Sequence, residues 1–272
     1  MKRFSRLGRR IAALLLLLAA QSLRAAAADI SPELRSEIAP TGKLRAAINY
    51  GNPVLAQKNA SAGAPLGVSA DLAREIANRL GLDIVYVEFD SAGVAFDAGR
   101  QGKWDVGFLA IDPKRAEDIV FSPPYVIIEG AYLVAADSPL TTVADVDRPG
   151  TRIAVGEGST YDLFLGRELK HATLVKAKTS PAAVEMFVDR KLEVAAGVRQ
   201  PLEAYARSHN GLRVLPGRFM AINQAIATPR GRPGAARYLR DFIEEMKASG
   251  FVARSLAASG QTDAAVAPPA AR

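Results

Sequence analysis

Residues 110–125 read AIDPKRAEDIVFSPPY and begin at a junction between a strand and a helix. The preceding residues, WDVGFLA at 104–110, are apolar enough to predict a buried strand. Asp112 and Pro113 are a favourable N-cap and first-turn pair for a short helix. Arg115 would lie in the first turn of that helix, where it is either a solvated side chain or a fixed cation that binds an anion.

Strand-like and helix-like segments alternate on both sides of this junction. Upstream, the pattern predicts strands at 44–50 and 84–89, a helix over 69–81 between them, and a weakly patterned helix after them. Downstream, the expected strands are 152–156, 172–177, 193–197 and 219–228, and the expected helices are 159–169, one from Ser180, 201–209 and one containing Tyr238, Phe242 and Met246. Such alternation predicts an α/β fold built on parallel sheets.

Two series of this kind predict two lobes. Strands expected at 125–134 and 219–227 are long enough to cross between the lobes, which would make the first lobe discontinuous. The last residues have no packing pattern and predict a tail without fixed structure. The expected boundaries are 42–127 and 223–258 for lobe 1, 128–222 for lobe 2, and 259–272 for the disordered tail.

The first 28 residues predict a secretory signal peptide. Five basic residues precede the uncharged run at 11–20, and small residues before about Ala28 offer a cleavage site. The alternative of a membrane anchor is disfavoured, because the apolar run is shorter than the roughly 20 residues that span a bilayer. Arg9 and Arg10 match a twin-arginine signal poorly, so ordinary secretion with cleavage is expected.

The charge balance depends on that segment. It holds six of the 35 Lys and Arg residues and none of the 28 Asp and Glu, which leaves 29 basic against 28 acidic groups. A nearly neutral remainder argues against nucleic-acid binding. The chain has no cysteine, and His171 and His209 lie far apart without carboxylates at ligand spacing, so no metal or cofactor is expected.

A second strand-to-helix turn, GEGSTYD, could hold the same anion from another side. Gly156 and Gly158 permit a close approach of the backbone, and Ser159 and Thr160 supply hydroxyls. The turn is not a dinucleotide fingerprint, because Tyr161 stands where a third glycine is needed, and it lacks the lysine of a phosphate loop. The alternative interpretation is a tight turn with an ordinary helix cap.

The order of three segments resembles the family 3 extracellular solute-binding proteins of ABC importers, the polar amino-acid binding group. The segments are GVSADLAREIANRLG, GKWDVGFLAIDPKRAEDIVFSPPY and DVDRPGTRIAVGEGSTYDLFL. The resemblance covers roughly residues 42–258, and its most specific part is Arg115 with FSPPY, followed by Gly158, Ser159 and Thr160. It implies a type II periplasmic-binding-protein fold, with two α/β sandwich lobes that a two-strand hinge closes on a solute.

This resemblance also implies roles for residues and partners. Arg115 matches the arginine that binds the carboxylate of the ligand, and Thr160, with Ser159 beside it, matches the hydroxyl residue that binds the same group from the second lobe. The implied partners are a small carboxylate or amino-acid ligand and an inner-membrane ABC permease. We therefore expect a periplasmic, monomeric protein that captures a solute and catalyses nothing.

The chain departs from the family at several positions. Ala110 stands where the family often has a serine, which leaves only a backbone contact with the ligand. Asn52 aligns with the aromatic residue that usually covers the ligand, although Tyr50 is two residues away. Val198 stands where the family has the acid that pairs with the ammonium of the ligand, and Arg199 follows it.

The departure at Val198 leaves two interpretations of the solute. An ammonium buried without a carboxylate is costly, so the solute is either a carboxylate without an ammonium or a diacid whose second group meets Arg199. Alternatively, Arg199 faces solvent, and Glu129, Glu157 or Asp162 supplies the acid for an ordinary amino acid.

One enzymatic alternative remains, since cyclohexadienyl dehydratases, which act on prephenate or arogenate, resemble this family. Catalysis would need a positioned acid–base group, and the sequence offers no His, Cys or Ser–base pairing for that purpose. Glu129 and Glu157 are the available carboxylates. A sensory ligand-binding domain is the third interpretation, and it would need an attached signalling module.

Overall fold

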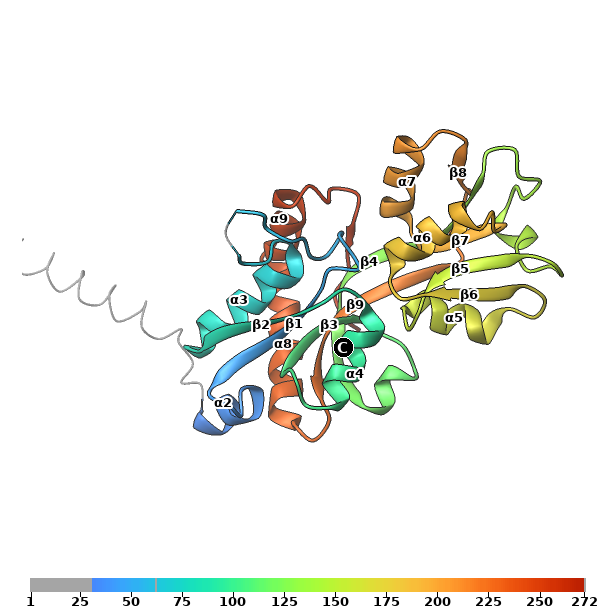
Figure 1. Cartoon of the computed structure of the whole chain (residues 1–272). Helices are drawn as coiled ribbons and strands as arrows, with labels where there is room; N and C mark the ends of the chain where they lie inside the picture. The colour runs from blue at the N-terminus through green and yellow to red at the C-terminus, as the bar shows by residue number, and fades with distance from the viewer. Residues whose placement is uncertain (1–30, 62, 272) are drawn as a thin grey trace, which may run out of the picture.

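The computed structural model describes residues 31–61 and 63–271, so the expected signal peptide at 1–28 lies outside the described residues. Two α/β lobes lie side by side, and two long strands run from one into the other (Figure 1). The expected two-lobed α/β architecture is thereby confirmed. None of the helices in the described ranges combines the length and the hydrophobicity needed to cross a bilayer.

The first lobe contains parallel strands packed against helices. Its strands are β1 (Lys43–Asn49), β2 (Asp83–Phe89) and β3 (Val106–Ala110), with β1 in the middle. Its helices are α2 (Pro32–Ile38), α3 (Val68–Leu80), α4 (Ala92–Arg100), α8 (Pro233–Ala248) and α9 (Phe251–Ala258). In α3, Leu72, Ile76 and Leu80 form the buried face that the sequence periodicity predicts, and Gly81 ends the helix in the left-handed conformation with φ 62°.

The second lobe repeats the alternation of strands and helices. Its strands are β5 (Arg152–Gly156), β6 (Thr173–Ala177), β7 (Val194–Val198) and β8 (Leu212–Val214). Its helices are α5 (Thr160–Glu168), α6 (Ser180–Asp189), α7 (Arg199–Ser208) and the single turn η2 (Val143–Asp145). β5 lies between β6 and β7 and runs parallel to both. Ser159 and Thr179 start α5 and α6 as N-caps, since each side chain accepts a backbone N–H of the first turn.

Two long antiparallel strands form the hinge, β4 (Ile119–Ala135) and β9 (Met220–Pro229). They join both lobes into one sheet with the order β2-β1-β3-β9-β4-β7-β5-β6. The ladder between them shifts register on either side of Pro124, because the prolines of FSPPY have no N–H to donate. The hydroxyl of Ser122 provides a hydrogen bond between the two strands at this irregularity, since it accepts the backbone N–H of Ile226 at 3.0 Å. The two joining strands expected from the sequence are confirmed.

The expectation of a disordered tail at 259–272 is wrong. β10 (Ala265–Val266) pairs antiparallel with the hinge strand β4. The backbone N–H of Ala267 continues this pairing by donating to the carbonyl of Tyr125 at 3.0 Å. These contacts are made by backbone groups, so a periodic pattern of side chains in the sequence does not predict them.

Truncation tests the contribution of β10 to stability. We expect a chain that ends at Ser259 to lose about 1–3 kcal/mol of free energy of unfolding, because a few backbone hydrogen bonds contribute about 1 kcal/mol each. Urea denaturation measures this difference. A chain that ends at Pro268 keeps β10 and should stay within about 0.5 kcal/mol of the full chain. Equal stability of both truncated chains would contradict the prediction.

Candidate functional site

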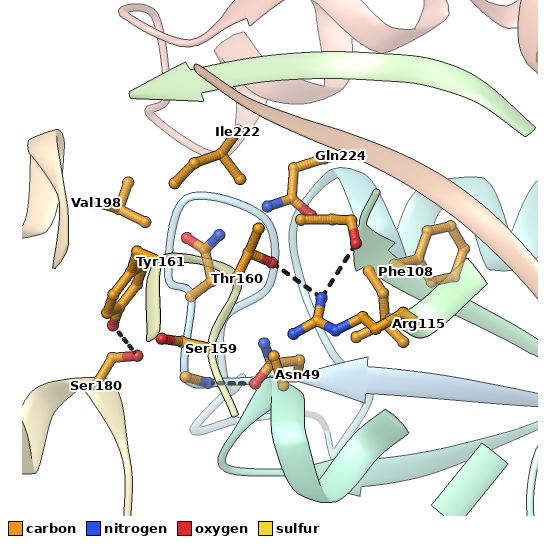
Figure 2. Close-up of a pocket in the computed structure, with 15 residues that line it drawn as sticks. Asn49, Phe108, Arg115, Ser159, Thr160, Tyr161, Ser180, Val198, Ile222 and Gln224 are labelled. Carbon is orange, nitrogen blue, oxygen red and sulfur yellow. Dashed lines mark hydrogen bonds between the residues drawn. The ribbon is translucent and has the colours of Figure 1, made fainter. Parts of the chain in front are cut away.

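A cavity of about 40 Å³ is lined by residues of both lobes, at the edge where β3 and β7 end and α5 begins. Ligands of open α/β sheets bind at this edge, because helix N-termini point toward it. Figure 2 shows the side chains that surround it. The lining residues are Asn49, Gly51, Asn52, Ala92, Phe108, Leu109, Ala110, Arg115, Ser159, Thr160, Tyr161, Ser180, Val198, Ile222 and Gln224.

Arg115 reaches this cavity from η1 (Arg115–Glu117), the short helix expected after Asp112. It is only 1% exposed, so its interpretation as a solvated surface side chain is wrong. Nη1 donates to the carbonyl of Ala110 at 3.1 Å and to Oγ1 of Thr160 at 3.0 Å (Figure 2). Nη2 donates to the carbonyl of Gly158 at 2.8 Å. Two of these bonds reach the second lobe, so the guanidinium connects the lobes.

The guanidinium of Arg115 is a desolvated cation without a full counter-charge. Burial lowers the pKa of Arg115 to about 10, while the nearby carboxylate of Asp112 acts in the opposite direction. Asp112 itself is paired with Arg167 at 2.9 Å. The three acceptors of Arg115 are uncharged oxygens, and its Nε has no acceptor within residues 31–61 and 63–271. An anion in the cavity would supply the missing charge.

The N-terminus of α5 faces the same cavity from the second lobe. The hydroxyl of Ser159 accepts the backbone N–H of Asp162 at 3.1 Å, whereas the N–H groups of Thr160 and Tyr161 lie in the first turn, where a helix offers no acceptor. Gly158 precedes the cap with φ +67°, a conformation that favours glycine. Free N–H groups and the positive end of the helix dipole both favour an anion here.

The predicted site residues fall into two groups. Those that line the cavity are Asn52, Ala110, Arg115, Ser159 and Thr160. Tyr50 and Arg199 do not line it. Tyr50 lies beneath Lys58, whose Nζ is 5.0 Å from the centre of its ring. Asn52 uses its side-chain oxygen to accept the N–H of Val54 at 3.3 Å, so it shapes the local turn as well as the cavity.

Arg199 is occupied by partners in its own surroundings. Its Nε donates to Glu129 at 2.7 Å, and Arg218 binds the other oxygen of Glu129 at 3.1 Å. These bonds lower the pKa of Glu129, and neither Arg199 nor Glu129 lines the cavity. Glu157 and Asp162, the other acids considered from the sequence, do not line it either.

Sequence reasoning missed two amide side chains in the lining, Asn49 and Gln224. Asn49 is the last residue of β1, and its side-chain oxygen accepts the N–H of Gly51 at 2.9 Å, which leaves its amide nitrogen free to donate. Gln224 is paired with Ala110 across β9 and β3, and its amide forms no hydrogen bond with another described residue. A polar residue inside the apolar run FMAINQAIAT was the available signal.

Comparison of the sequence with models of known protein families finds a match over most of the chain. The model of the bacterial extracellular solute-binding proteins, family 3, matches residues 44–258. Among curated proteins, none matches the chain.

Three solved structures illustrate the likeness of fold. An amino acid ABC transporter substrate-binding protein from Streptococcus pneumoniae bound to L-arginine has a TM-score of 0.72 at 19% identity, over 87% of this chain and 100% of that one. The solute receptor for L-cysteine of Neisseria gonorrhoeae has a TM-score of 0.72 at 20% identity, and the match covers 84% of this chain and 93% of that one. An ancestral amino acid-binding protein, a precursor of cyclohexadienyl dehydratase, has a TM-score of 0.69 at 22% identity, and the match covers 82% of this chain and 97% of that one.

Replacement of Arg115 by methionine tests how much its buried charge contributes to folding. We expect the free energy of unfolding of Arg115→Met to stay within about 1 kcal/mol of the parent or to rise, because desolvation offsets hydrogen bonds to neutral acceptors. Urea denaturation measures it. The matched control is Arg45→Met, which removes two side-chain hydrogen bonds, at 2.9 and 2.8 Å, from the fully buried Asp105, leaves it with Arg232 at 3.0 Å, and should cost about 2 kcal/mol or more. A larger loss for Arg115→Met than for Arg45→Met would contradict this expectation.

Proposed function

The chain belongs to the bacterial extracellular solute-binding proteins of family 3, and from that premise we propose that it is the periplasmic binding component of an ABC importer. It captures a small carboxylate-bearing solute, an amino acid or a related organic acid, between two closing lobes and delivers it to an inner-membrane permease. The matched residues 44–258 include the whole cavity and both hinge strands, which supports a role for this cleft in binding.

One observation carries the proposal. Arg115 is the only charged residue among the described residues that line the cavity, and it is buried opposite the N-terminus of α5. Its Nη2, which has one acceptor among the described residues, and the N–H groups of Thr160 and Tyr161 are donors suited to the two oxygens of one carboxylate. The hydroxyl of Thr160 accepts from Arg115, so its own proton is free to bind the same group.

The competing candidate is a dehydratase on the same scaffold, because a precursor of cyclohexadienyl dehydratase shares the fold at a TM-score of 0.69. Elimination of water needs a group that moves a proton to or from the substrate. The described lining consists of amides, hydroxyls, apolar groups and one guanidinium, which are suited to holding a carboxylate. Turnover of prephenate or arogenate by the purified protein would favour the enzyme over the binding protein.

Capture requires the lobes to approach closely, and two contacts between them support such a closed state. Asp112 of the first lobe and Arg167 of α5 form an ion pair at 2.9 Å. Gly93 of α4 lies against the turn before α5, where a Cβ on Gly93 would be 3.0 Å from the carbonyl of Glu157 and 3.0 Å from Cα of Gly158. The lobes meet there without side chains between them, so the solute shifts an equilibrium toward this closed form.

Binding measurements with Arg115 variants test the proposed role directly. Mass spectrometry of the solute retained on the purified protein identifies the ligand for calorimetry. We expect Arg115→Met to weaken its binding by about 100-fold or more, because two charge-assisted hydrogen bonds of about 1.5–3 kcal/mol each are lost. Arg115→Lys should retain part of the affinity, since it keeps the charge but not the fork.

Arg218→Met is the matched control, because Arg218 binds Glu129 outside the cavity and should leave the affinity unchanged. Unchanged affinity in Arg115→Met would refute the assignment of the carboxylate site.

A methyl group at Gly93 tests closure separately from folding. Gly93→Ala should keep or raise the free energy of unfolding, since alanine favours a helix over glycine by about 0.5–1 kcal/mol. Its solute affinity should fall about tenfold, because the added Cβ overpacks the contact by about 1–2 kcal/mol. Calorimetry measures the affinity, and small-angle X-ray scattering measures how much the radius of gyration shrinks with solute.

Gly166→Ala is the control for this change. Gly166 also lies in a helix, but a Cβ there would meet nothing closer than Leu174 at 3.9 Å. Equal affinity and equal shrinkage for Gly93→Ala and Gly166→Ala would show that the lobes do not close at this contact.

A further inference from the structure

The chemistry of the whole cleft narrows the class of solute, on the premise that the proposed function holds. We propose that the solute is a monocarboxylate with an uncharged, largely apolar body and no ammonium group. Its carboxylate binds Arg115 and the N-terminus of α5, and its body passes Val198 and Tyr161 into an adjoining side pocket.

The side pocket is a cavity of about 190 Å³ that adjoins the cavity around Arg115. Gly51, Tyr161, Ser180 and Val198 line both spaces. In Figure 2, Val198 and Tyr161 lie on the side of the cavity away from Arg115, which is the side where the side pocket begins. The inner cavity of about 40 Å³ is about three times the 10–15 Å³ that one water needs, so it has room for a carboxylate. The remainder of the solute therefore occupies the side pocket.

The walls of the side pocket are mostly apolar. α6 and α7 contribute Val184, Leu202 and Tyr205, and Pro181 and Pro201 complete this surface. Such a surface favours aliphatic or aromatic carbon and offers little to a charged group. The only charged residue lining it within the described parts of the chain is Glu185, an exposed residue of α6.

An ammonium next to the carboxylate would have no counter-charge. The described residues that line the inner cavity include no Asp or Glu. Asp162 binds the backbone N–H of Gly158 at 2.9 Å and Lys176 at 3.1 Å, so it is already paired outside the cavity. Val198 stands at the point where the two spaces meet, and it presents a hydrocarbon surface there. Loss of hydration without a partner makes this position unfavourable for a cation.

A second carboxylate on the solute would be equally unfavourable. Arg199, the nearest candidate in the sequence to Val198, donates to Glu129 at 2.7 Å and does not line either space. A second carboxylate would lie among apolar walls with Glu185 as the only charged neighbour in the described lining, and like charges repel. The diacid interpretation is therefore replaced by a single carboxylate.

Calorimetry with pairs of compounds that differ by one group tests this inference. The pairs are 4-methylpentanoate with leucine, 3-phenylpropionate with phenylalanine, and hexanoate with adipate. We expect each plain monocarboxylate to bind at least about tenfold tighter than its partner, because an unpaired buried charge costs more than 1 kcal/mol. Arg115→Met should lower the affinity for every compound that the parent protein binds.

Two substitutions of Val198 provide a test that keeps the fold. Val198 is the N-cap of α7 and makes no side-chain cap bond, so Asp and Asn are both favourable there. Val198→Asp should reduce the preference for 4-methylpentanoate over leucine by about tenfold, because it places a carboxylate beside the ammonium. Val198→Asn has the same shape as Val198→Asp without the charge and should reduce this preference less than Val198→Asp does.

The outcomes separate this inference from the proposed function. The inference is overturned if leucine or phenylalanine binds as tightly as the matching acid and if Arg115→Met lowers that affinity. The proposed function would still hold in that case. Tighter binding of adipate than of hexanoate also overturns the inference. Absence of binding by every compound, with no solute retained on the purified protein, overturns both.

Discussion

A cation buried between two lobes is the constraint on which the rest of the structure depends. Arg115 is 1% exposed and shares its hydrogen bonds among acceptors of both lobes, while its Nε has no acceptor among the described residues. A buried charge without a counter-charge is costly, so the surroundings of this guanidinium favour an anion. The end of β3, the turn η1 and the N-cap of α5 all serve to place this guanidinium against helix N–H groups.

The hinge explains how one cation can belong to two lobes. β4 and β9 run through both lobes as neighbours in a single sheet, so a change at their middle moves one lobe relative to the other. The irregular pairing at Pro124 lies in this crossing region, and β10 pairs with β4 just beyond it. Besides the hydrogen bonds of Arg115, the lobes meet where Gly93 lies against Gly158 and where Asp112 pairs with Arg167.

Most of the fold could be predicted from local sequence patterns. The features that sequence reasoning missed depend on contacts between segments that are far apart in the chain. The periodicity of α3 and the caps of α5 and α6 depend on neighbours within a few residues, so the sequence predicts them. β10 pairs through backbone groups with a strand far away in the sequence, and the pairing of Arg199 with Glu129 depends on the fold, so neither leaves a local signal.

The direct measurement of the central claim is a crystal structure of the protein with the solute that it retains on purification. The account predicts electron density for a carboxylate within hydrogen-bonding distance of the guanidinium of Arg115 and of the backbone N–H of Thr160 or Tyr161, with the body of the solute beyond Val198. A solute bound elsewhere, or one that presents a neutral or cationic group to Arg115, would contradict the account.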